Sequence, residues 1–493
     1  MSAQLPILVI LWPLVAAPLC TLLHNRQVAW MFSAVATWAS LLTAIGLYIQ
    51  TSAGGELVYE LGGWPPPWGI SVNIDSLNAL VLLLITGMAS VLIFAFPASL
   101  TIQWLGNRAR LYYTAYLLCL ASLIGITITG DAFNVFVFLE ISSLSTYALV
   151  AMGRDRRAQV AAFRYLIMGT VGATFILISV GLLYMVTGTL NMADLAERIP
   201  ALHDNRVVRA AFGFFIIGAG VKVAMFPMHF WLPGAYSYAP SIASAFLAAT
   251  ATKVAVYIML RFVFGVFGAD LFFDVLALDQ VFLLFATVGI VVGSLAALYK
   301  DDIKAVLAYS SVAQLAYMVL GIAVGSVSGL TAAVVHIFNH GLIKAALFIV
   351  LAGIFVRFQC TRLSELAGLG KYAPWTVGAF GVGAMSLIGI PGTAGFISKW
   401  YLLLSVLEHH WWFMALVIIG SSLLALAYMW RVIDALWLRE PTQLVQERGR
   451  EAPLNMLIPA WTLAAANFFF GIDTTVTLGA ASRAVASLLG VSS

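Results

Sequence analysis

The chain has 493 residues, of which 62% are hydrophobic and only 9% carry charge, and its formal net charge is +4 at pH 7. Soluble globular proteins are about 25% charged and 45–50% apolar, so this composition disfavours an ordinary soluble enzyme, a disordered chain, a collagen-like chain and a β-barrel porin. It predicts an all-α membrane protein that crosses the bilayer many times.

About fourteen stretches are long and apolar enough for a transmembrane helix, which needs roughly 20 mostly apolar residues. Their centres lie near residues 14, 40, 87, 120, 142, 175, 218, 251, 289, 315, 344, 387, 421 and 463. The first stretch has no basic residue before it and is followed by Arg26. A cleavable secretory signal has its basic residues first, so this stretch is expected to remain as a permanent helix.

The basic residues of the loops alternate between two sides. Odd-numbered loops, counted from the N-terminus and including Lys304, carry 16 lysines and arginines, whereas the even-numbered side, including Arg261, carries 5. Cytoplasmic loops are enriched in Lys and Arg, so the odd loops are expected in the cytoplasm and both termini on the outer side of the cell (inner) membrane. This distribution explains the positive net charge, and no nucleic-acid partner is expected.

Five ionisable groups remain inside apolar stretches: Glu140, Lys222, Lys253, Lys344 and Lys399. A charge at the bilayer centre costs about 2.5–3.5 kcal/mol on insertion scales, so five together cost on the order of ten kcal/mol, comparable with a whole folding free energy. A lysine near a span end can instead snorkel to the interface, which suits Lys399 better than the others, or tie helices together. Five groups together favour a pathway for protons or cations.

Two histidines extend this set. His336, His340 and Lys344 recur at every fourth position and therefore lie on one face of a helix. A neutral imidazole can take up a proton on one nitrogen and release one from the other, so the row predicts a proton relay. Elsewhere, Tyr257 falls one turn after Lys253 and is expected to offer it a hydroxyl.

Two prolines interrupt apolar stretches: Pro227 in KVAMFPMHFWLP and Pro391 in LIGIPGTAGFISKW. Each lacks an N–H and clashes with the carbonyl four residues earlier, at Val223 and Leu387. Carbonyls freed at membrane depth need water or polar partners, so such breaks normally line a cavity. Interrupted helices at matching places are also typical of inverted-repeat transporters, although a packing kink is the alternative for either proline alone.

Electrostatics predicts how these groups act together. One opposite charge at about 4 Å is worth roughly 4 kcal/mol at an effective dielectric near 20, so moving Glu140 toward or away from Lys222 would make that lysine hold or release a proton. Lys253 and the histidine row would carry the proton laterally, and Lys399 would exchange it with one aqueous side. Ser143 lies three residues after Glu140 and is expected to bond that carboxylate.

Several motifs of enzymes and metal sites do not occur in the sequence. There is no GxxxxGK[ST] phosphate loop, no HExxH metal site and no GxSxG nucleophile elbow. The three cysteines lie apart in apolar sequence without a CxxC, which suits neither a disulfide framework nor a zinc or iron–sulfur site. We expect no cofactor and no metal, and a transporter subunit rather than an enzyme.

Three segments resemble a known family: WLPGAYSYAPSIASAFLAATATKVAVY, DDIKAVLAYSSVAQLAYM and FNHGLIKAALF. They are similar to signatures of the antiporter-like subunits of respiratory complex I and of Mrp-type multisubunit Na+/H+ antiporters, from about residue 75 to 435. Within the family the chain looks most like the D-type subunits of Mrp antiporters. Gly234, Ala235 and Tyr236 stand where complex I members have DAH, and Lys399 stands where the complex I M-type subunit has a carboxylate.

The resemblance implies a fold of fourteen helices, with helices 4–8 and 9–13 as inverted repeats and helices 7 and 12 broken. The units would be residues 1–100, 101–265, 266–438 and 439–493. Partner membrane subunits are implied as well, so this chain would not be a complete transporter. The family's pathway residues fall on Glu140 of helix 5, Lys222 of helix 7, Lys253 of helix 8, His336, His340 and Lys344 of helix 11, and Lys399 of helix 12.

Residues and resemblance together predict a proton-translocating subunit of a multisubunit antiporter that exchanges H+ for a monovalent cation, expected to be Na+. No cluster of carboxylates in the sequence resembles a sodium cage, so the cation is expected to pass through a partner. The alternative is a proton-pumping membrane subunit of a complex I-like NADH:quinone oxidoreductase or of a membrane-bound hydrogenase. A third reading is a scaffold whose lysines merely pin helices together.

Overall fold

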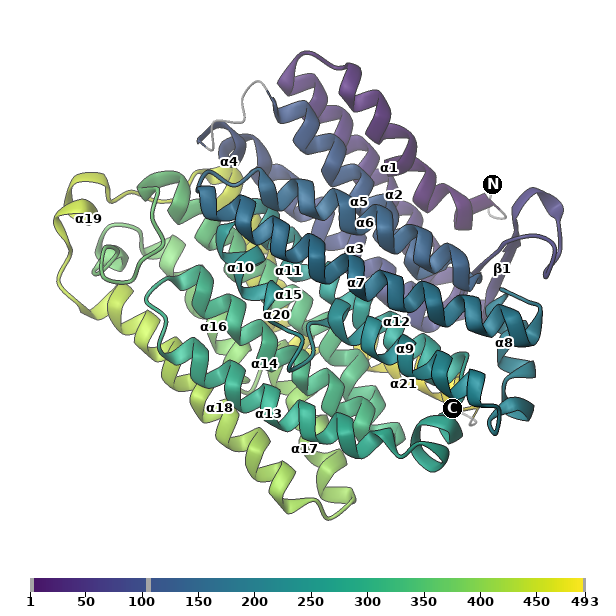
Figure 1. Ribbon diagram of the computed structural model, residues 1–493. Coiled ribbons are helices and arrows are strands. Elements are labelled where there is room, and N and C mark those ends of the chain that lie inside the picture. Colours follow the sequence, from purple (N-terminus) through teal and green to yellow (C-terminus); the bar gives the residue numbers. More distant parts are fainter. Residues whose placement is uncertain (1–3, 103–107, 491–493) are drawn as a thin grey trace.

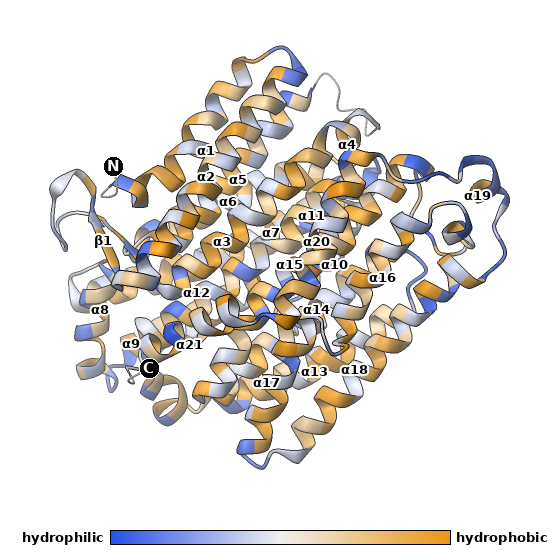
Figure 2. Cartoon of the chain, turned by 180° about the vertical axis from the view of Figure 1, so that it is seen from behind, coloured by the Kyte–Doolittle hydropathy of each residue, from blue (hydrophilic) through white to orange (hydrophobic). Residues whose placement is uncertain are grey.

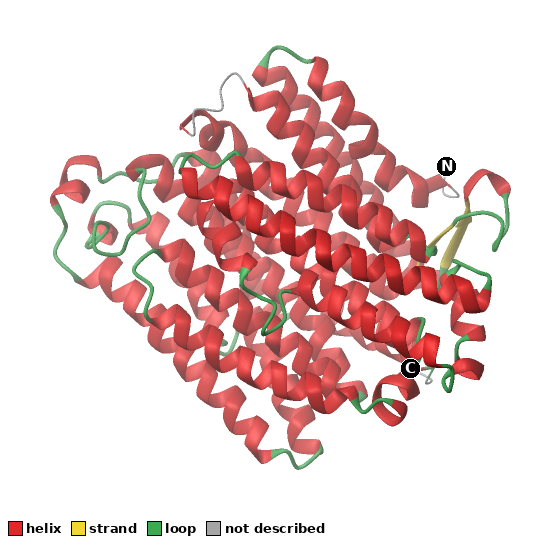
Figure 3. Cartoon of the chain, viewed as in Figure 1, coloured by secondary structure: helices red, strands yellow, loops and turns green. Residues whose placement is uncertain are grey.

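The computed structural model describes residues 4–102 and 108–490 as a bundle of long helices that run roughly parallel or antiparallel to one another (Figure 1). Helices dominate the described chain, beside one short β-hairpin (Figure 3). The hairpin pairs β1 (Leu57–Glu60) with β2 (Ser71–Ile74) in antiparallel register, with Leu57 opposite Ile74. The fold is therefore of the all-α membrane class that the composition predicts.

The helices follow one another in the order of the predicted units. The N-terminal part holds α1 (Leu5–Leu22), α2 (Arg26–Gly54), α3 (Ser76–Leu92) and α4 (Phe96–Ile102). The first unit holds α5 (Ala109–Ile128), α6 (Ala132–Ala151), α7 (Arg156–Thr187), α8 (Met192–Arg198), α9 (Arg206–Val223), α10 (Trp231–Tyr238), α11 (Ser241–Ala249) and α12 (Ala251–Gly265). The second unit holds α13 (Leu278–Leu298), α14 (Ile303–Val324), α15 (Val327–Phe358), α16 (Pro374–Ile388), α17 (Ala394–Glu408) and α18 (Trp412–Ile433). The C-terminal part holds α19 (Gln443–Arg448), α20 (Leu454–Ile472) and α21 (Thr475–Leu489).

The boundaries of these units stay predictions. Those after residues 265 and 438 fall at the ends of elements, whereas the one after residue 100 falls inside α4. Twelve helices of the described chain are long and apolar enough to cross a membrane. Two further stretches are interrupted, between α9 and α10 around Pro227 and between α16 and α17 around Pro391. The total of fourteen spans and the inverted relation of the two units also stay predictions.

Two further interruptions lie where the sequence has no proline. Thr250, with φ −122° and ψ −59°, separates α11 from α12. Near the C-terminus, α20 ends at Ile472 and α21 begins at Thr475. The separate helix α21 was not predicted, because its residues TVTLGAASRAVASLL are small and only weakly apolar.

Hydrogen bonds join loops of the same predicted side. At one end, which we call the odd-loop end, Ile303 N donates to the Thr361 carbonyl at 2.9 Å and joins the loop before α14 to the loop after α15. At the opposite end Tyr59 Oη donates to Gln4 Oε1 at 2.8 Å, beside the start of α1. Figure 1 shows α1 beginning and α21 ending on the side of β1 and α8, with α19 at the other end. Both ends of the described chain therefore lie on one side.

The centre of the bundle is α15. Its most apolar 18 residues are 89% buried, whereas those of α1, α2, α7, α13 and α18 are only 39% buried. The less buried helices expose large apolar side chains, and Figure 2 shows hydrophobic residues along the helices of the bundle. α15 packs against α3, α11, α14, α16, α17, α20 and α21. Polar residues in the middle of α15, such as His336, His340 and Lys344, consequently lie deep inside the bundle.

Candidate functional site

The two buried histidines lie on α15. His336 is 3% exposed, and His340 and Lys344 are fully buried. Their imidazole rings stack with centroids 5.6 Å apart and planes 5° from parallel. Both ring nitrogens of His340, and Nε2 of His336, have no hydrogen-bond partner among the described residues. The row therefore presents uncommitted proton donors and acceptors inside the bundle.

From His336 the row continues to α17. His336 Nδ1 lies 2.7 Å from the Ser398 hydroxyl, next to Lys399 in the sequence. Tyr317 of α14 faces both residues: its ring meets His336 nearly edge-on at a centroid distance of 5.9 Å, and Lys399 Nζ lies 5.4 Å from the ring centroid. An ammonium near an aromatic face is stabilised by the ring quadrupole. Ser398 and Tyr317 thus connect the histidine row to Lys399.

Lys399 occupies the helix break at Pro391. Its Nζ donates to the carbonyls of Leu387 and Ile388, each at 2.9 Å, in the last turn of α16. Carbonyls at a helix C-terminus carry partial negative charge and stabilise a cation, and Leu387 is the carbonyl that Pro391 is predicted to free. Lys399 is 7% exposed, so it points into the bundle and does not snorkel to an interface.

At the other end of the row, Lys344 contacts α14. Its Nζ donates to the Leu307 carbonyl at 2.8 Å and to the Ser310 hydroxyl at 2.6 Å. Within the described residues no carboxylate forms an ion pair with Lys344. Dipoles alone hold this ammonium, and no permanent counter-charge fixes its protonation.

Lys253 lies at the break between α11 and α12. Its Nζ donates to the carbonyl of Ala248, in the last turn of α11, and lies 3.4 Å from Thr252 Oγ1. It interacts electrostatically with the histidines and the lysine of α15, against which α11 and α12 pack. The prediction for Tyr257 was wrong: its hydroxyl donates to the Thr127 carbonyl at 2.8 Å, because Lys253 turns back toward α11.

The two predicted switch residues come from α6 and α9. Lys222, in the last turn of α9, donates a 2.6 Å hydrogen bond to the Ser143 hydroxyl and interacts electrostatically with Glu140. The prediction that Ser143 bonds Glu140 was wrong, because Ser143 instead accepts from Lys222. Glu140 is half-buried, and its Oε1 has no partner within the described chain. Glu140 thus lies near Lys222 without a contact ion pair between described atoms.

The predicted residues therefore fall into two groups. One is the central row, which we define as Lys344, His340, His336, Ser398 and Lys399, with Lys253 beside it. The other is Glu140 with Ser143 and Lys222. No hydrogen bond joins the two groups in the part of the chain that is described.

The sequence and the fold of this chain are similar to those of known proteins. Residues 129–425 match the family described as NADH:quinone oxidoreductase/Mrp antiporter, transmembrane. The chain belongs to this family. It is 42% identical over 489 residues to the N subunit of the NADH-quinone oxidoreductase of Desulforudis audaxviator, with 96% of both chains covered. It is 30% identical over 473 residues to the D subunit of the Na(+)/H(+) antiporter of Alkalihalophilus pseudofirmus, covering 95% of this chain and 94% of that one.

Solved structures with the same fold come from two kinds of complex. A chain of the Mrp complex from Dietzia sp. matches with a TM-score of 0.89 at 26% identity, over 99% of this chain and 97% of that one. A chain of the membrane-bound sulfane sulfur reductase, titled an archaeal respiratory membrane complex, matches with a TM-score of 0.89 at 28% identity, over 99% and 98%. The protein is thus an antiporter-like, multi-span membrane subunit of the NADH:quinone oxidoreductase/Mrp antiporter family.

Two buried charges of this family member were not predicted from the sequence. Arg261, assigned to a loop, has a side chain only 17% exposed and forms a 2.8 Å ion pair with Asp75 Oδ2. It also donates to Asn78 Oδ1 at 2.7 Å. The available signal was DSLN before an apolar run, a capping box in which Asp75 and Asn78 begin α3. Lys304, likewise assigned to a loop, is 5% exposed.

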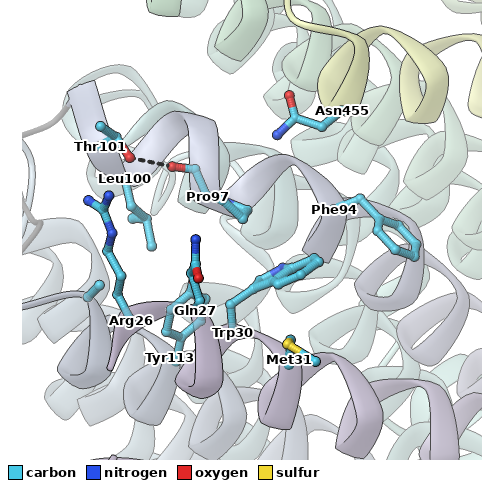
Figure 4. A pocket seen from close by; sticks show the side chains of 11 residues that line it. Arg26, Gln27, Trp30, Met31, Phe94, Pro97, Leu100, Thr101, Tyr113 and Asn455 are labelled. Atoms are coloured by element: carbon cyan, nitrogen blue, oxygen red, sulfur yellow. Dashed lines mark hydrogen bonds between the residues drawn. The ribbon is translucent and has the colours of Figure 1, made fainter. Parts of the chain in front are cut away.

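A separate cavity of about 440 Å³ lies between α2, α4, α5 and α20 (Figure 4). Arg26 and Gln27 lie at one end of it and Phe94 at the other. None of the seven predicted pathway residues lines it, and its lining has one cation and no carboxylate. We therefore do not assign it to the site. Among the described residues no three His, Cys, Asp or Glu side chains are grouped as metal ligands.

Proposed function

We propose that this chain is a proton-translocating subunit of a multisubunit Na+/H+ antiporter of the Mrp type. The observation that carries the proposal is the central row: five residues from two helices that offer a nearly continuous series of proton donors and acceptors in the interior of the bundle. A purely structural tie needs satisfied hydrogen bonds, yet His340 has none from described residues on either nitrogen. Unsatisfied buried nitrogens cost free energy unless water reaches them, which favours a hydrated path.

The chemistry of the row is proton exchange between neutral and charged forms. A proton that reaches Lys344 passes to His340, which releases one from its other nitrogen toward His336. Ser398 and Tyr317 lead on to Lys399, held by the α16 carbonyls. Helix-end dipoles stabilise an ammonium by at most about 2 kcal/mol, less than the insertion cost of about 2.5–3.5 kcal/mol. The dipoles thus offset most of the cost of a charged lysine without locking it in the charged state.

The electrostatic driver is Glu140 together with Lys222. Ser143 holds the ammonium at 2.6 Å, while the half-buried carboxylate makes no contact ion pair with it. A shift of Glu140 toward Lys222 would gain several kcal/mol and hold the proton there; its withdrawal would release the proton toward Lys253 and the row. Because Glu140 is not covered by this chain alone, a partner subunit is expected against α6 and can impose that shift.

The assembly is proposed from the relatives. The antiporter relative and the Mrp complex support partner membrane subunits, H+ and Na+ as transported ions, and a place in the cell membrane. The cation itself is expected to pass through a partner, because the described part of this chain offers no group of three potential metal ligands.

A second candidate is a proton-pumping membrane subunit of a redox complex. The 42% identity to the N subunit of an NADH-quinone oxidoreductase and the match to a respiratory reductase support it. The proton row would be the same, and only the driving partner would differ. Neighbouring genes would separate the two: small Mrp-type partners favour the antiporter, and subunits with iron–sulfur motifs favour the redox pump.

The row is tested in inverted vesicles from an antiporter-deficient host that makes the chain with its partner subunits. Dissipation of a preformed pH gradient on addition of Na+ is the readout. We expect Glu140→Gln and Lys222→Gln to lower the rate by about 100-fold or more, the contribution of a positioned proton-transfer group. Lys371→Gln, which removes an exposed lysine paired with Glu440 at 3.1 Å, is the charge-matched control and should transport normally.

Three other outcomes have definite meanings. Normal transport by Glu140→Gln contradicts the proposed function. Transport per assembled complex that is unchanged, together with less complex in the membrane, supports the scaffold reading instead. A gradient that responds to an electron donor and quinone, but not to Na+, assigns the chain to the redox pump.

A further inference from the structure

Two polar cavities open at the odd-loop end, lined by elements of both the first and the second predicted unit. Their volumes are about 620 and 630 Å³, and they share part of their lining. The shared residues are Arg157, Ser237, Tyr238, Asp302 and Arg362. They come from the start of α7, the end of α10, the start of α14 and the loop after α15. These charged and hydroxyl side chains offer hydrogen-bond partners to water, so the cavities can hold water.

Lys304 lies in the lining of the cavity of about 620 Å³. It lines one cavity beside Asp302, is 5% exposed, and donates from Nζ to the Ala239 carbonyl at 2.7 Å. Ala239 is the residue that ends α10, so Lys304 occupies the same kind of helix C-terminus as Lys253 and Lys399. Asp302 is engaged elsewhere, capping α14 and accepting from Thr361 Oγ1 at 2.7 Å.

The first two turns of α14 lie between Lys304 and the central row. Leu307 and Ser310 follow Lys304 at three and six residues, and these are the two residues that hold the Lys344 ammonium. Residues three apart are neighbours on a helix surface, so Lys304 lies near Leu307 and Leu307 lies near Ser310. The two steps together rise by about 9 Å along the helix, a length that two or three water molecules would span. Lys304 is therefore the nearest cavity-lining lysine, along α14, to the start of the row.

We propose that the two cavities are the aqueous entrance for protons from the odd-loop side, and that Lys304 passes protons to Lys344. The proposal rests on the proposed function. In the step, an N–H bond of the Lys304 ammonium breaks and its proton enters a water chain that ends at Ser310. The neutral amine of Lys344 gains an N–H bond, so one positive charge moves inward. Lys304 is then reprotonated by hydronium from the cavity.

A structural role for Lys304, in which it only caps α10, makes a different prediction for arginine. Arginine keeps the positive charge and can donate to the Ala239 carbonyl, but it does not release a proton in proteins. We expect Lys304→Arg to leave the amount of assembled complex unchanged and to slow Na+-driven proton movement by about 100-fold or more. Normal transport by assembled Lys304→Arg would overturn the relay.

A second measurement tests the entrance without altering Lys304. In a Cys360→Ser background, Ser237→Cys places a thiol in the lining that both cavities share, and Ser364→Cys places one on the exposed surface at the same end, outside both linings. A membrane-impermeant methanethiosulfonate cation is added from the odd-loop side to vesicles that hold the whole complex. Modification of Ser237→Cys should stop most of the transport, whereas modification of Ser364→Cys should not.

The results distinguish failure of the proposed entrance from failure of the proposed function. Transport that persists after complete modification of Ser237→Cys overturns the proposed entrance. If Lys304→Arg fails to assemble, the cysteine measurement alone decides whether the cavities are the entrance. If Glu140→Gln abolishes transport while Lys304→Arg and the modified Ser237→Cys transport normally, the entrance fails and the proposed function stands. If Glu140→Gln transports normally, the proposed function fails first.

Discussion

At the scale of single residues, the buried lysines are held by helix ends and hydroxyls and not by carboxylates. Lys253, Lys304 and Lys399 each donate to a carbonyl at the end of an interrupted helix, and Lys222 donates to a hydroxyl. Such dipoles offset part of the cost of a charge in an apolar interior. No contact ion pair completes the compensation among the described residues, which is why we propose that each lysine loses its proton during a cycle.

The hydrogen bond between Ser143 and Lys222 gives a direct test of this idea. Ser143→Ala removes a bond to a charged group, worth about 1.5–3 kcal/mol, so we expect transport to fall by about tenfold or more. Ser142→Ala is the matched control, because the neighbouring Ser142 side chain makes no hydrogen bond to Lys222. Rates per assembled complex are compared in the vesicle assay. Equal rates for the two variants would show that Ser143 does not support the lysine.

Cys360, beside the cavities in the loop after α15, gives a pH-dependent test. Burial raises the pKa of its thiol from 9.0 to about 12. Since the thiolate is the reactive form, a shift of about three units lowers the reactive fraction near pH 8 about a thousandfold. Alkylation by iodoacetamide, followed by mass spectrometry, should therefore be slow at pH 8 and should still rise steeply with pH at pH 9.5. The exposed thiol of Ser364→Cys should react much faster, and a Cys360 rate that levels off below pH 10 would contradict the burial.

At the scale of elements, the sequence reveals helix breaks only where it carries proline. Pro227 and Pro391 mark two interruptions, and the carbonyl expected to be freed at Leu387 is the one that Lys399 contacts. Thr250 marks a third interruption without proline or glycine, where α11, packed against α15, ends. The helix face of a residue follows from spacing, as for the histidine row, but its partner does not. Ser143 and Tyr257 were assigned to the wrong partners for that reason.

The break between α16 and α17 contains two glycines. Substituting each of them distinguishes the effect of backbone strain from the effect of contact with Lys399. Gly389 and Gly392 have φ of +91° and +86°, so alanine at either position is strained by about 1–2 kcal/mol. An added Cβ would lie 3.1 Å from Lys399 Cδ at Gly389, whereas it would meet nothing within 4 Å at Gly392.

We therefore expect Gly389→Ala and Gly392→Ala to lower the melting temperature by similar amounts, and only Gly389→Ala to slow transport strongly, because it displaces Lys399. Thermal unfolding of the purified complex and the vesicle assay measure the two effects. Equal loss of transport in both variants would show that backbone conformation matters and that contact with Lys399 does not.

At the scale of the whole molecule, charge alternation predicts which loops lie together. The loops before α14 and after α15 are far apart in the sequence, yet they share a backbone hydrogen bond at the odd-loop end. The alternation of charge could not predict how deeply a basic residue is buried. Lys304 and Arg261 were counted as loop residues because each lies near a span end, whereas folding buries both against neighbouring helices. Glu140 is only half-buried in this chain, which is why we propose that a partner subunit completes this part of the site.

The orientation of the molecule decides from which compartment the cavities draw protons. Ser52, at the end of α2, and Ser364, in the loop after α15, are both exposed and lie at opposite ends of the bundle. In a Cys360→Ser background we expect an impermeant maleimide to label Ser52→Cys in intact cells and Ser364→Cys only in inverted vesicles. The reason is the excess of basic residues in the odd loops, 16 against 5, which are retained in the cytoplasm. The reverse labelling pattern would invert the topology and make the cavities an outer entrance. Labelling of both thiols in intact cells would contradict the separation of the two ends by the membrane.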